Sequence, residues 1–529
     1  MGEEIVSVGS ASSLAAIDIA IIVAYMVGMQ LVGMFYARYV HSAGDFFLAG
    51  KALPFWAVGI SIVASDIGAI DLITGSGAAY RHGVAQANFD WIGSVPAVLL
   101  AAFVFLPYYW RAGVYTIPEF LGRRYNAGVQ WLQAVIWLLF MAVNVSLMLW
   151  MASVVLNTVL GWSPPVAIAV TAVLVGLYTV TGGLAAVVMT DVLQVVVMFV
   201  GAGALVVLSV WDAGGWSHMS QTILAQPGTT PDFFTLLVPH GAKTPYPWTG
   251  IVFGLGIVMS TAYFVGNQAI LQRALGARSE WDAKAGMIVA GFLKLLIPML
   301  MFVPGIAARA LYPDLDKPDS AVPTLVRDLM PAGLRGLMFA AFFAALMSSV
   351  DSYLNSWTTV FISDLYSKFY RRVAGRPLGD QRALVLSRWL TGVLLVAASL
   401  FAPVIGKFET IYVALQTILS FFQGPTLAIL LLGILWRRAT GWGGLVGLVT
   451  GVFLTMILSW LGGDVFPSER PFLFVSFWSF WCTLAVTIVV SLLTKPEPPE
   501  KLRGLVYGEV LRDPAAQALL AERMRSTDG

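Results

Sequence analysis

The sequence has few charged residues: only 11% of its 529 residues are Asp, Glu, Lys or Arg, less than half the average share in soluble proteins. Its single cysteine, Cys482, excludes an internal disulfide and a cysteine-based metal cluster. Lys and Arg number 31 against 29 Asp and Glu, so no long-range charge attracts nucleic acid. Neither the phosphate-binding motif G-x-x-x-x-G-K-[ST] nor a kinase signature occurs. Any active transport is therefore expected to use an ion gradient.

Apolar residues, in contrast, make up 58% of the chain. Apolar stretches longer than about 18 residues recur from end to end, which predicts an all-α integral membrane protein. Thirteen spans are predicted near residues 14–37, 53–78, 88–110, 128–159, 163–180, 185–211, 248–271, 284–308, 333–366, 385–404, 409–435, 440–462 and 471–494. An odd number of spans predicts that the two termini lie on opposite sides of the membrane.

Basic residues predict the orientation of these spans, because Lys and Arg accumulate in cytoplasmic loops. If the N-terminus lies outside, 21 Lys and Arg residues fall in segments on the cytoplasmic side of the membrane and eight in segments on the outer side. We therefore expect a protein of the plasma membrane or a bacterial inner membrane, with its N-terminus outside and its C-terminus in the cytoplasm. Its expected partners are the lipid bilayer and a small-molecule solute, without nucleic acid. The sequence does not fix the oligomeric state, and a monomer suffices for such a function.

Ionisable residues inside the spans are candidates for function, because a charged side chain in hydrocarbon is costly. Six residues qualify: Asp66, Asp71, Asp90, Asp191, Asp351 and Lys294. A structural ion pair or a water-facing helix end is the alternative for any one of them. Their clustering on a few spans favours function.

The second predicted span combines glycines with acids. Between Gly59 and Gly77 it carries four glycines and two aspartates in 19 residues, which predicts a helix that breaks midway. Where a helix breaks inside a membrane, the freed carbonyl oxygens line a cavity and can coordinate a small cation. Close helix packing on small residues is the alternative.

The ninth predicted span carries a row of hydroxyl groups. Its polar residues are Ser348, Ser349, Asp351, Ser352, Asn355 and Ser356. Oxygen atoms that carry little charge, such as hydroxyls and backbone carbonyls, suit a hard alkali cation. Serines that hydrogen-bond their own helix are the alternative.

Four motifs in the sequence form a pattern known from one family. They are Y-T-V-T-G-G-L-A-A-V-V-M-T-D-V-L-Q at 178–194, G-V-Y-T-I-P-E-F-L-G-R-R-Y at 113–125, N-Q-x-x-x-Q-R-x-L at 267–275 and S-S-V-D-S-Y-L-N-S at 348–356. In this order and spacing, from about residue 44 to 440, the chain resembles the sodium:solute symporters. Within that family it is most similar to the sodium/sugar branch, the sodium/glucose and sodium/galactose cotransporters.

The resemblance implies a five-plus-five inverted repeat with broken helices and binding at mid-membrane. The expected divisions are an N-terminal span with an inner loop, a first repeat, an outer loop, a second repeat, two C-terminal spans and a cytoplasmic tail. They correspond to residues 1–52, 53–211, 212–247, 248–436, 437–494 and 495–529. Spans two to six form the first repeat, and spans seven to eleven form the second.

The resemblance also implies where the coupling ion, Na⁺, binds. The main sodium site is expected to consist of the carbonyls of Ala64, Ile67 and Ala345 and the hydroxyls of Ser348 and Ser349. A second sodium site is implied at Asp191, Asp351 and Ser352, a region where only some members hold an ion. No organic cofactor is expected.

The solute site follows from the same resemblance. The implied solute-binding residues are Asp71, Asp90, Asn144, Ser260, Lys294 and Gln416, and the implied inner gate consists of Tyr263, Asp66 and Phe264. Several positions depart from the glucose and galactose pattern, with Asp71 for Gln or His, Gly93 for Ser, Ser260 for Asn and Phe264 for Trp. The site is therefore sugar-like without being that of a known glucose or galactose transporter.

The predicted function is that of a sodium-coupled secondary active symporter, not an enzyme, which imports a small hydroxylated solute by alternating access. Asp71 and Asp90 beside Lys294 carry a formal charge of −1, which predicts a neutral sugar or polyol, with a cationic solute as the near alternative. A monocarboxylate, amino acid or vitamin symporter stays open, as does a transporter-like sensor or channel. An intramembrane enzyme is disfavoured, because all four histidines lie in loops or at span ends.

Overall fold

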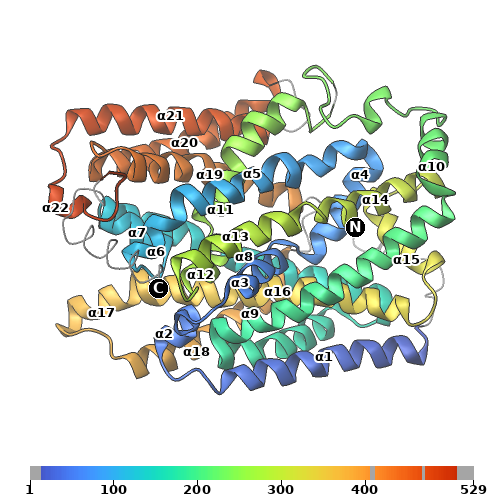
Figure 1. Ribbon diagram of the computed structural model, residues 1–529, viewed down its shortest axis with the longest axis horizontal. Helices are drawn as coiled ribbons and strands as arrows, with labels where there is room; N and C mark the ends of the chain where they lie inside the picture. The colour runs from blue at the N-terminus through green and yellow to red at the C-terminus, as the bar shows by residue number, and fades with distance from the viewer. Residues whose placement is uncertain (1–13, 243, 406–410, 467–470, 509–529) are drawn as a thin grey trace, which may run out of the picture.

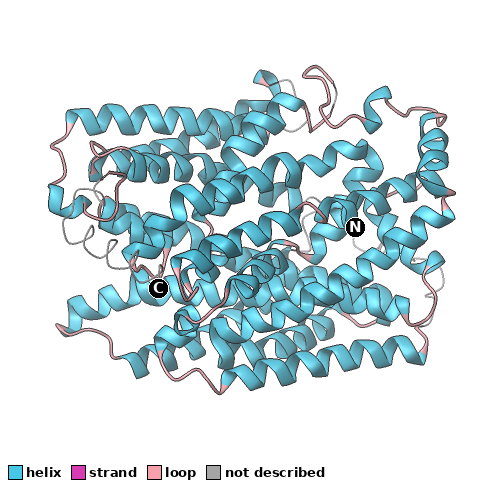
Figure 2. Cartoon of the chain, viewed as in Figure 1, coloured by secondary structure: helices cyan, strands magenta, loops and turns pink. Residues whose placement is uncertain are grey.

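The computed structural model describes residues 14–242, 244–405, 411–466 and 471–508, and at residues 70, 158–160, 411–419 and 463–464 it describes the backbone alone. Within these ranges every named element is a helix (Figure 2), as predicted. Most of the long helices run along the long axis of the molecule, with α1 (Ala16–Ala37) at one edge and α21 (Phe472–Leu493) at the opposite edge (Figure 1).

Nine helical segments of the described chain are long and apolar enough to cross a membrane, and two bent pairs raise the number to eleven. The nine are α1, Phe89–Ala112 (η3 to α6), Ala127–Asn157 in α8 (Ala127–Leu160), α9 (Pro164–Asp212), Glu280–Leu311 (α13 and α14), Leu334–Ala374 (α16 to α17), α18 (Asp380–Ile405), Gly441–Gly462 in α20 (Gly441–Val465), and α21. The bent pairs are α3 (Phe55–Asp66) with α4 (Ala69–His82), and η6 and α11 (Gly250–Gly266) with α12 (Gln268–Leu275).

The number of spans differs from the predicted thirteen at two places. The predicted spans 163–180 and 185–211 both lie in α9, whose 49 residues would extend roughly 73 Å as one straight helix, more than twice the hydrocarbon thickness. Gly183 interrupts α9 with φ +54° and ψ −157°, a conformation that glycine adopts without steric cost. The predicted span 409–435 corresponds to α19 (Ile411–Leu435), of which the first nine residues have only their backbone described.

The loops that the sequence assigns to one side of the membrane lie together at one end of the helices. In Figure 1, α2 (Ala43–Leu48), α7 (Ile117–Arg124), α17 (Ser367–Ala374) and α22 (Pro499–Leu502) lie at the left end, and all four belong to predicted inner segments. At the right end lie α10 (Gly215–Leu224) and α15 (Ala321–Leu329), which belong to predicted outer loops.

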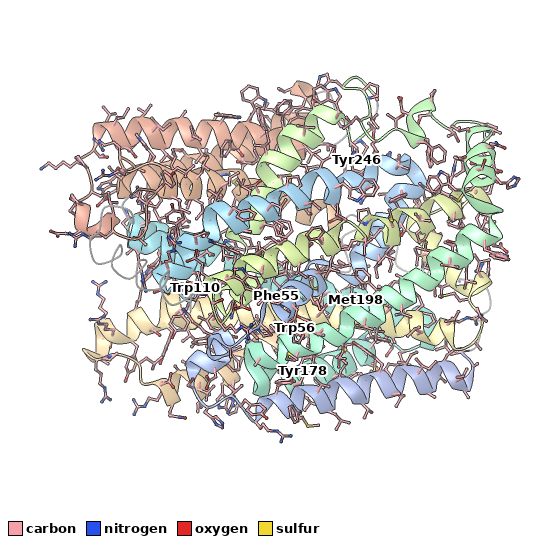
Figure 3. All side chains as sticks on the ribbon, viewed as in Figure 1. Phe55, Trp56, Trp110, Tyr178, Met198 and Tyr246 are labelled. Carbon is pink, nitrogen blue, oxygen red and sulfur yellow. The ribbon has the colours of Figure 1, made fainter. Side chains whose placement is uncertain are left out.

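The helix α16 (Leu334–Val360) forms the centre of the molecule. In the most apolar stretch of the span that contains α16, 89% of the residues are buried. The helix packs against α1, α3, α8 and α9. The helix α1 approaches α9 closely at Gly33, where a Cβ atom would lie 2.4 Å from the Cβ of Tyr178. Tyr178, which is labelled in Figure 3, donates its hydroxyl hydrogen bond to Asp351 Oδ2 of α16 over 2.7 Å. The polar row of α16 therefore faces the protein interior rather than lipid.

Candidate functional site

The break predicted in the second span is confirmed. The helix α3 ends at Asp66, Ile67 and Gly68 are extended, and α4 begins at Ala69. The Asp71 side chain accepts a hydrogen bond from the Gly68 backbone amide through Oδ2 at 2.8 Å, which caps the N-terminus of α4. Because the chain leaves the helix here, the last carbonyl groups of α3 lack their usual partners in the helix.

Backbone and hydroxyl oxygens meet between this break and α16. The Ser348 hydroxyl lies 2.9 Å from the Ala64 carbonyl oxygen and 3.0 Å from the Ala345 carbonyl oxygen. The Ser349 hydroxyl also lies 3.0 Å from the Ala345 carbonyl, and both serines are buried. Four of the five residues proposed for the main sodium site thus contact one another directly, and the fifth, Ile67, is the first extended residue of the break. We name this set the oxygen cluster.

The chemistry of the oxygen cluster fits a sodium ion. Its members offer only oxygen atoms, two from hydroxyl groups and the others from backbone carbonyls, and hard cations take such ligands. None of the five side chains carries a charge, as expected for a weakly held monovalent ion rather than a divalent one. Each hydroxyl can rotate its hydrogen away and present a lone pair to an ion.

The second proposed sodium region holds a buried arginine. The side chains of Arg273 and Asp191 are both fully buried, and their Nη2 and Oδ2 atoms lie 3.3 Å apart. The Arg273 Nε donates to Ser61 Oγ over 2.6 Å, and its Nη2 donates to Ser65 and Ser352. The guanidinium of Arg273 therefore supplies positive charge where a second ion is implied.

Arg273 is a buried residue of this region that the sequence did not single out. It was counted among the inner-loop basic residues, yet the structure buries it completely between α3, α9, α12 and α16. Asp351 belongs to the same region, where it accepts hydrogen bonds from Tyr178 and Ser352. Asp191 Oδ1 has no hydrogen-bond partner among the described residues, so one carboxylate oxygen is still available there.

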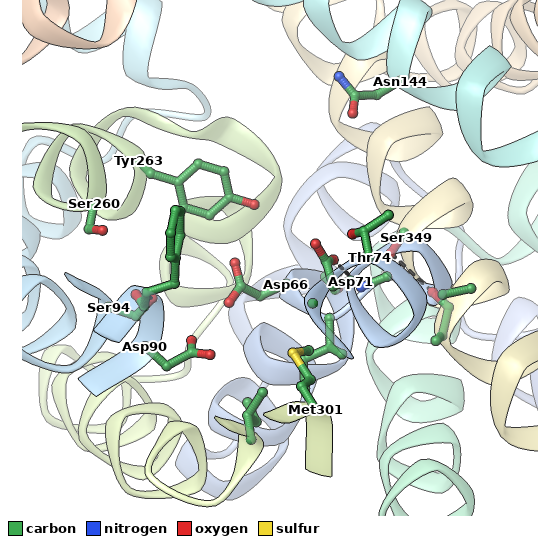
Figure 4. Close-up of a pocket in the computed structure, with 18 of the residues that line it drawn as sticks. Asp66, Asp71, Thr74, Asp90, Ser94, Asn144, Ser260, Tyr263, Met301 and Ser349 are labelled. Carbon is green, nitrogen blue, oxygen red and sulfur yellow. Dashed lines mark hydrogen bonds between the residues drawn. The ribbon is translucent and has the colours of Figure 1, made fainter. Parts of the chain in front are cut away.

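A cavity of about 220 Å³ lies beside the break, and Figure 4 shows it in close-up. Five of the six proposed solute-binding residues line it, as do all three gate residues: Asp71, Asp90, Asn144, Ser260, Lys294, Tyr263, Asp66 and Phe264. Ile67, Ala345 and Ser349 of the oxygen cluster line it too. The cavity and the oxygen cluster therefore share a wall.

The sixth proposed residue, Gln416, has a side chain outside the described residues, so its role stays a prediction. The same helix brings Gln423 to the cavity instead, with 4% of its surface exposed. Gln423 lies seven residues, or about two helical turns, beyond Gln416 and thus near the same face of α19. This spacing is the signal that could have identified it.

Lys294 pairs with two carboxylates at once. Its ammonium group lies 2.5 Å from Asp90 Oδ1 and forms a second ion pair with Asp66. It also lies 5.6 Å from the centre of the Phe264 ring, within the range of a cation–π interaction. From the sequence Asp66 is expected only at the gate, whereas in the structure it is also a partner of Lys294.

The proposed gate residue Tyr263 lies between the acids and α16. Its hydroxyl hydrogen-bonds Asp66 and Tyr353, and its ring makes an edge contact with Phe264 at 5.4 Å between centroids. Figure 4 shows its hydroxyl end directed toward the acids. Ser260 lies one turn before Tyr263 on α11, and a Cβ at position 93 would come within 2.7 Å of its hydroxyl. Because glycine has no Cβ atom, Gly93 leaves space for the Ser260 side chain.

Known sequences of one family are similar to this chain. The profile of a family described as "Sodium:solute symporter family" matches residues 46–451. The chain is 31% identical over 505 residues to a sodium/glucose cotransporter of Vibrio parahaemolyticus, covering 91% of each protein. It is also 31% identical over 547 residues to a sodium/myo-inositol cotransporter of Canis lupus familiaris, covering 93% of this chain and 75% of that protein.

Two solved structures have a similar fold. A Na⁺-coupled sialic acid symporter in a substrate-bound outward-open state gives a TM-score of 0.80 at 23% identity, covering 91% of this chain and 99% of that one. Mhp1, a nucleobase-cation-symport-1 family transporter, gives a TM-score of 0.55 at 12% identity, covering 86% and 97%. At these identities the similarity concerns the fold alone.

Proposed function

Because the chain belongs to the sodium:solute symporter family and is thus a sodium-coupled solute symporter of the membrane, we propose that it imports a small hydroxylated solute of the sugar or polyol class by alternating access. The proposed coupling site is the oxygen cluster, and the proposed solute site is the cavity beside it. The observation that carries the proposal is their shared wall at Ile67, Ala345 and Ser349.

The shared wall supplies a physical route for coupling. A sodium ion in the oxygen cluster would join the end of α3 to α16, and these two elements also border the cavity. The ion drives transport only if it binds one conformation more tightly than the other. Ile67 lies in the break between α3 and α4, so an ion bound there together with α16 also fixes how α4 leaves α3. This favours the conformation in which the solute cavity is complete, so sodium binding and solute binding support each other.

The arrangement of bent helices supports the proposed five-plus-five inverted repeat within the thirteen predicted spans. The α3–α4 pair bends by 62° and the α11–α12 pair by 54°, and these are the first spans of the two proposed repeats. Broken helices in corresponding positions of two halves are typical of secondary transporters that bind solute at mid-membrane. We propose the orientation with the N-terminus outside, in which the end that carries α2, α7, α17 and α22 faces the cytoplasm.

The sugar or polyol class is supported by the relatives and by the cavity. Two relatives are named for glucose and myo-inositol, and the cavity of about 220 Å³ is smaller than the usual site of a drug-sized ligand. Uptake into proteoliposomes tests this proposal, with labelled sugars, polyols and organic acids supplied with and without an inward sodium gradient. We expect gradient-dependent uptake of a sugar or polyol; uptake of organic acids alone would contradict the class while leaving symport intact.

We expect the protein to move one sodium ion per solute. A second ion at Asp191, Asp351 and Ser352 would lie beside the Arg273 guanidinium, which already pairs with Asp191 and would repel it. Parallel measurement of labelled sodium and solute fluxes gives the ratio. A ratio of two in the wild type that falls to one in Asp191→Asn would instead support a second ion at Asp191.

Replacing Tyr263 by phenylalanine is expected to slow turnover about tenfold with unchanged expression. The change keeps the aromatic ring but removes the hydroxyl that bonds Asp66, and a hydrogen bond to a charged group is worth about 1.5–3 kcal/mol. Initial uptake rates over a range of solute concentrations measure the effect, with the exposed Tyr39→Phe as the control. Unchanged kinetics in Tyr263→Phe would show that the ring acts through its bulk.

A further inference from the structure

We propose that the solute carries one positively charged nitrogen beside its hydroxyl groups, as an amino sugar or amino polyol does. The inference rests on the proposed function, because it assumes that the cavity is the solute site. Three independent features of the cavity lead to it: its charge, its surplus of hydrogen-bond acceptors and its aromatic side chains.

The first feature is a charge imbalance. The carboxylates of Asp66, Asp71 and Asp90 border one cavity that holds a single cationic side chain, Lys294. Asp66 and Asp90 share the Lys294 ammonium, while Asp71 caps the N-terminus of α4, a position that favours a negative charge. Asp71 and Asp90 with Lys294 give the formal charge of −1 expected from the sequence, and Asp66 makes it −2.

The coupling ion offsets half of this charge. One sodium ion in the adjacent oxygen cluster reduces the formal charge around the cavity from −2 to −1. A neutral solute would leave that charge uncompensated inside the membrane, where unpaired charge is costly. A solute with one positive charge would bring the loaded site to neutrality.

The second feature is a surplus of hydrogen-bond acceptors. The Asn144 amide nitrogen donates to the Phe140 carbonyl over 2.9 Å, and the Ser94 hydroxyl donates to the Phe89 carbonyl. Gln423 and Gln86, in contrast, each have a carbonyl oxygen without a hydrogen-bond partner among the described residues, and Gln423 is 96% buried. Two donors of the cavity are thus engaged while two acceptors have no partner, which suits a ligand rich in donors. An ammonium group offers three donors and no acceptor.

The third feature is the aromatic lining. Phe89, Phe140, Tyr263, Phe264 and Tyr353 all border the cavity. The faces of such rings attract cations, as the position of Lys294 over Phe264 illustrates within this site. The rings also cover the apolar side of a sugar or cyclitol.

Competition between matched compounds tests the proposal. The purified full-length protein in proteoliposomes receives an inward sodium gradient and pairs that differ only in the amino group: glucosamine and glucose, galactosamine and galactose, aminodeoxyinositol and myo-inositol. N-acetylglucosamine serves as the neutral analogue of glucosamine. We expect at least one amine to be transported and to compete at least tenfold better than its neutral partner. Electrical measurement should then give two positive charges per amine transported, one from sodium and one from the solute.

The variant Asp71→Asn separates charge from shape. Asparagine keeps an oxygen that can cap α4 but removes one negative charge from the cavity. We expect the preference for the amine to disappear in this variant and to persist in the control Asp316→Asn, which alters an exposed loop residue. Transport of neutral sugars or polyols with no advantage for amines would overturn the inference and leave the proposed function standing. If no member of the panel is driven by sodium, the sugar or polyol function itself is wrong.

Discussion

Alanine at both Ser348 and Ser349 is expected to reduce sodium-driven uptake to background. The two hydroxyls are the only side-chain oxygens of the oxygen cluster, and each contacts a backbone carbonyl that belongs to the same cluster. Without them an ion would keep only backbone carbonyl ligands, those of Ala64 and Ile67 at the end of α3 and that of Ala345 on α16. Uptake with and without a sodium gradient, normalised to the amount of inserted protein, measures the result.

The control for this prediction is Ser387→Ala. Ser387 is likewise buried and bonds its own helix, with its hydroxyl 2.7 Å from the Ala383 carbonyl oxygen, but it lies on α18 away from the cluster. Its substitution should leave sodium dependence intact. If the double variant is well expressed and keeps a wild-type dependence on sodium, the oxygen cluster is not the coupling site.

Replacing Arg273 by glutamine is expected to destabilise the protein by about 3–5 kcal/mol, the typical cost of removing one member of a buried ion pair. The change leaves Asp191 charged and buried with only hydroxyl partners, and it removes the donor to Ser61 and Ser352. Thermal unfolding of the purified protein in detergent measures the loss. The double variant Asp191→Asn with Arg273→Gln removes both charges and should recover most of the lost stability.

The nearby Arg278→Gln gives the matched control. Arg278 forms an ion pair with Asp282, but its side chain is 59% exposed, and exposed pairs contribute about 0–1 kcal/mol. Its substitution should barely change the unfolding temperature. A double variant as unstable as Arg273→Gln alone would show that Arg273 acts through its shape and hydrogen bonds rather than through the charge of Asp191.

The sequence predicted those features that depend on local composition. Glycines and acids between Gly59 and Gly77 predicted the break, which the structure has at Ile67 and Gly68. The hydroxyl row of the ninth span likewise predicted a polar helix inside the protein, and the span that contains α16 is the most buried of the nine candidate spans in the described chain. Both features follow from residues that are close in the chain, where helix geometry fixes their relative positions.

Features that depend on contacts between residues far apart in the chain could not be predicted from the sequence. Arg273 follows an apolar span and therefore looked like a loop residue. Its burial depends on Ser61, Asp191 and Ser352, which lie 212, 82 and 79 residues away. The ion pair of Asp66 with Lys294 spans a similar distance along the chain, and no local pattern encodes either contact. The boundary predicted between the spans 163–180 and 185–211 coincides with the kink of α9 at Gly183, where one residue turns the chain without a polar loop.

The Arg273 contacts also determine which parts of the molecule can move relative to each other. This one side chain joins α3, α9, α12 and α16. Backbone hydrogen bonds between Leu53 and residues 276 and 278 connect the adjoining ends of α3 and α12 as well. One half of each broken helix is therefore fastened to a common rigid body, while the other halves, α4 and α11, lie beyond the extended residues at 67–68 and 267. These residues can serve as hinges, so opening and closing would swing α4 and α11 while α3 and α12 stay in place.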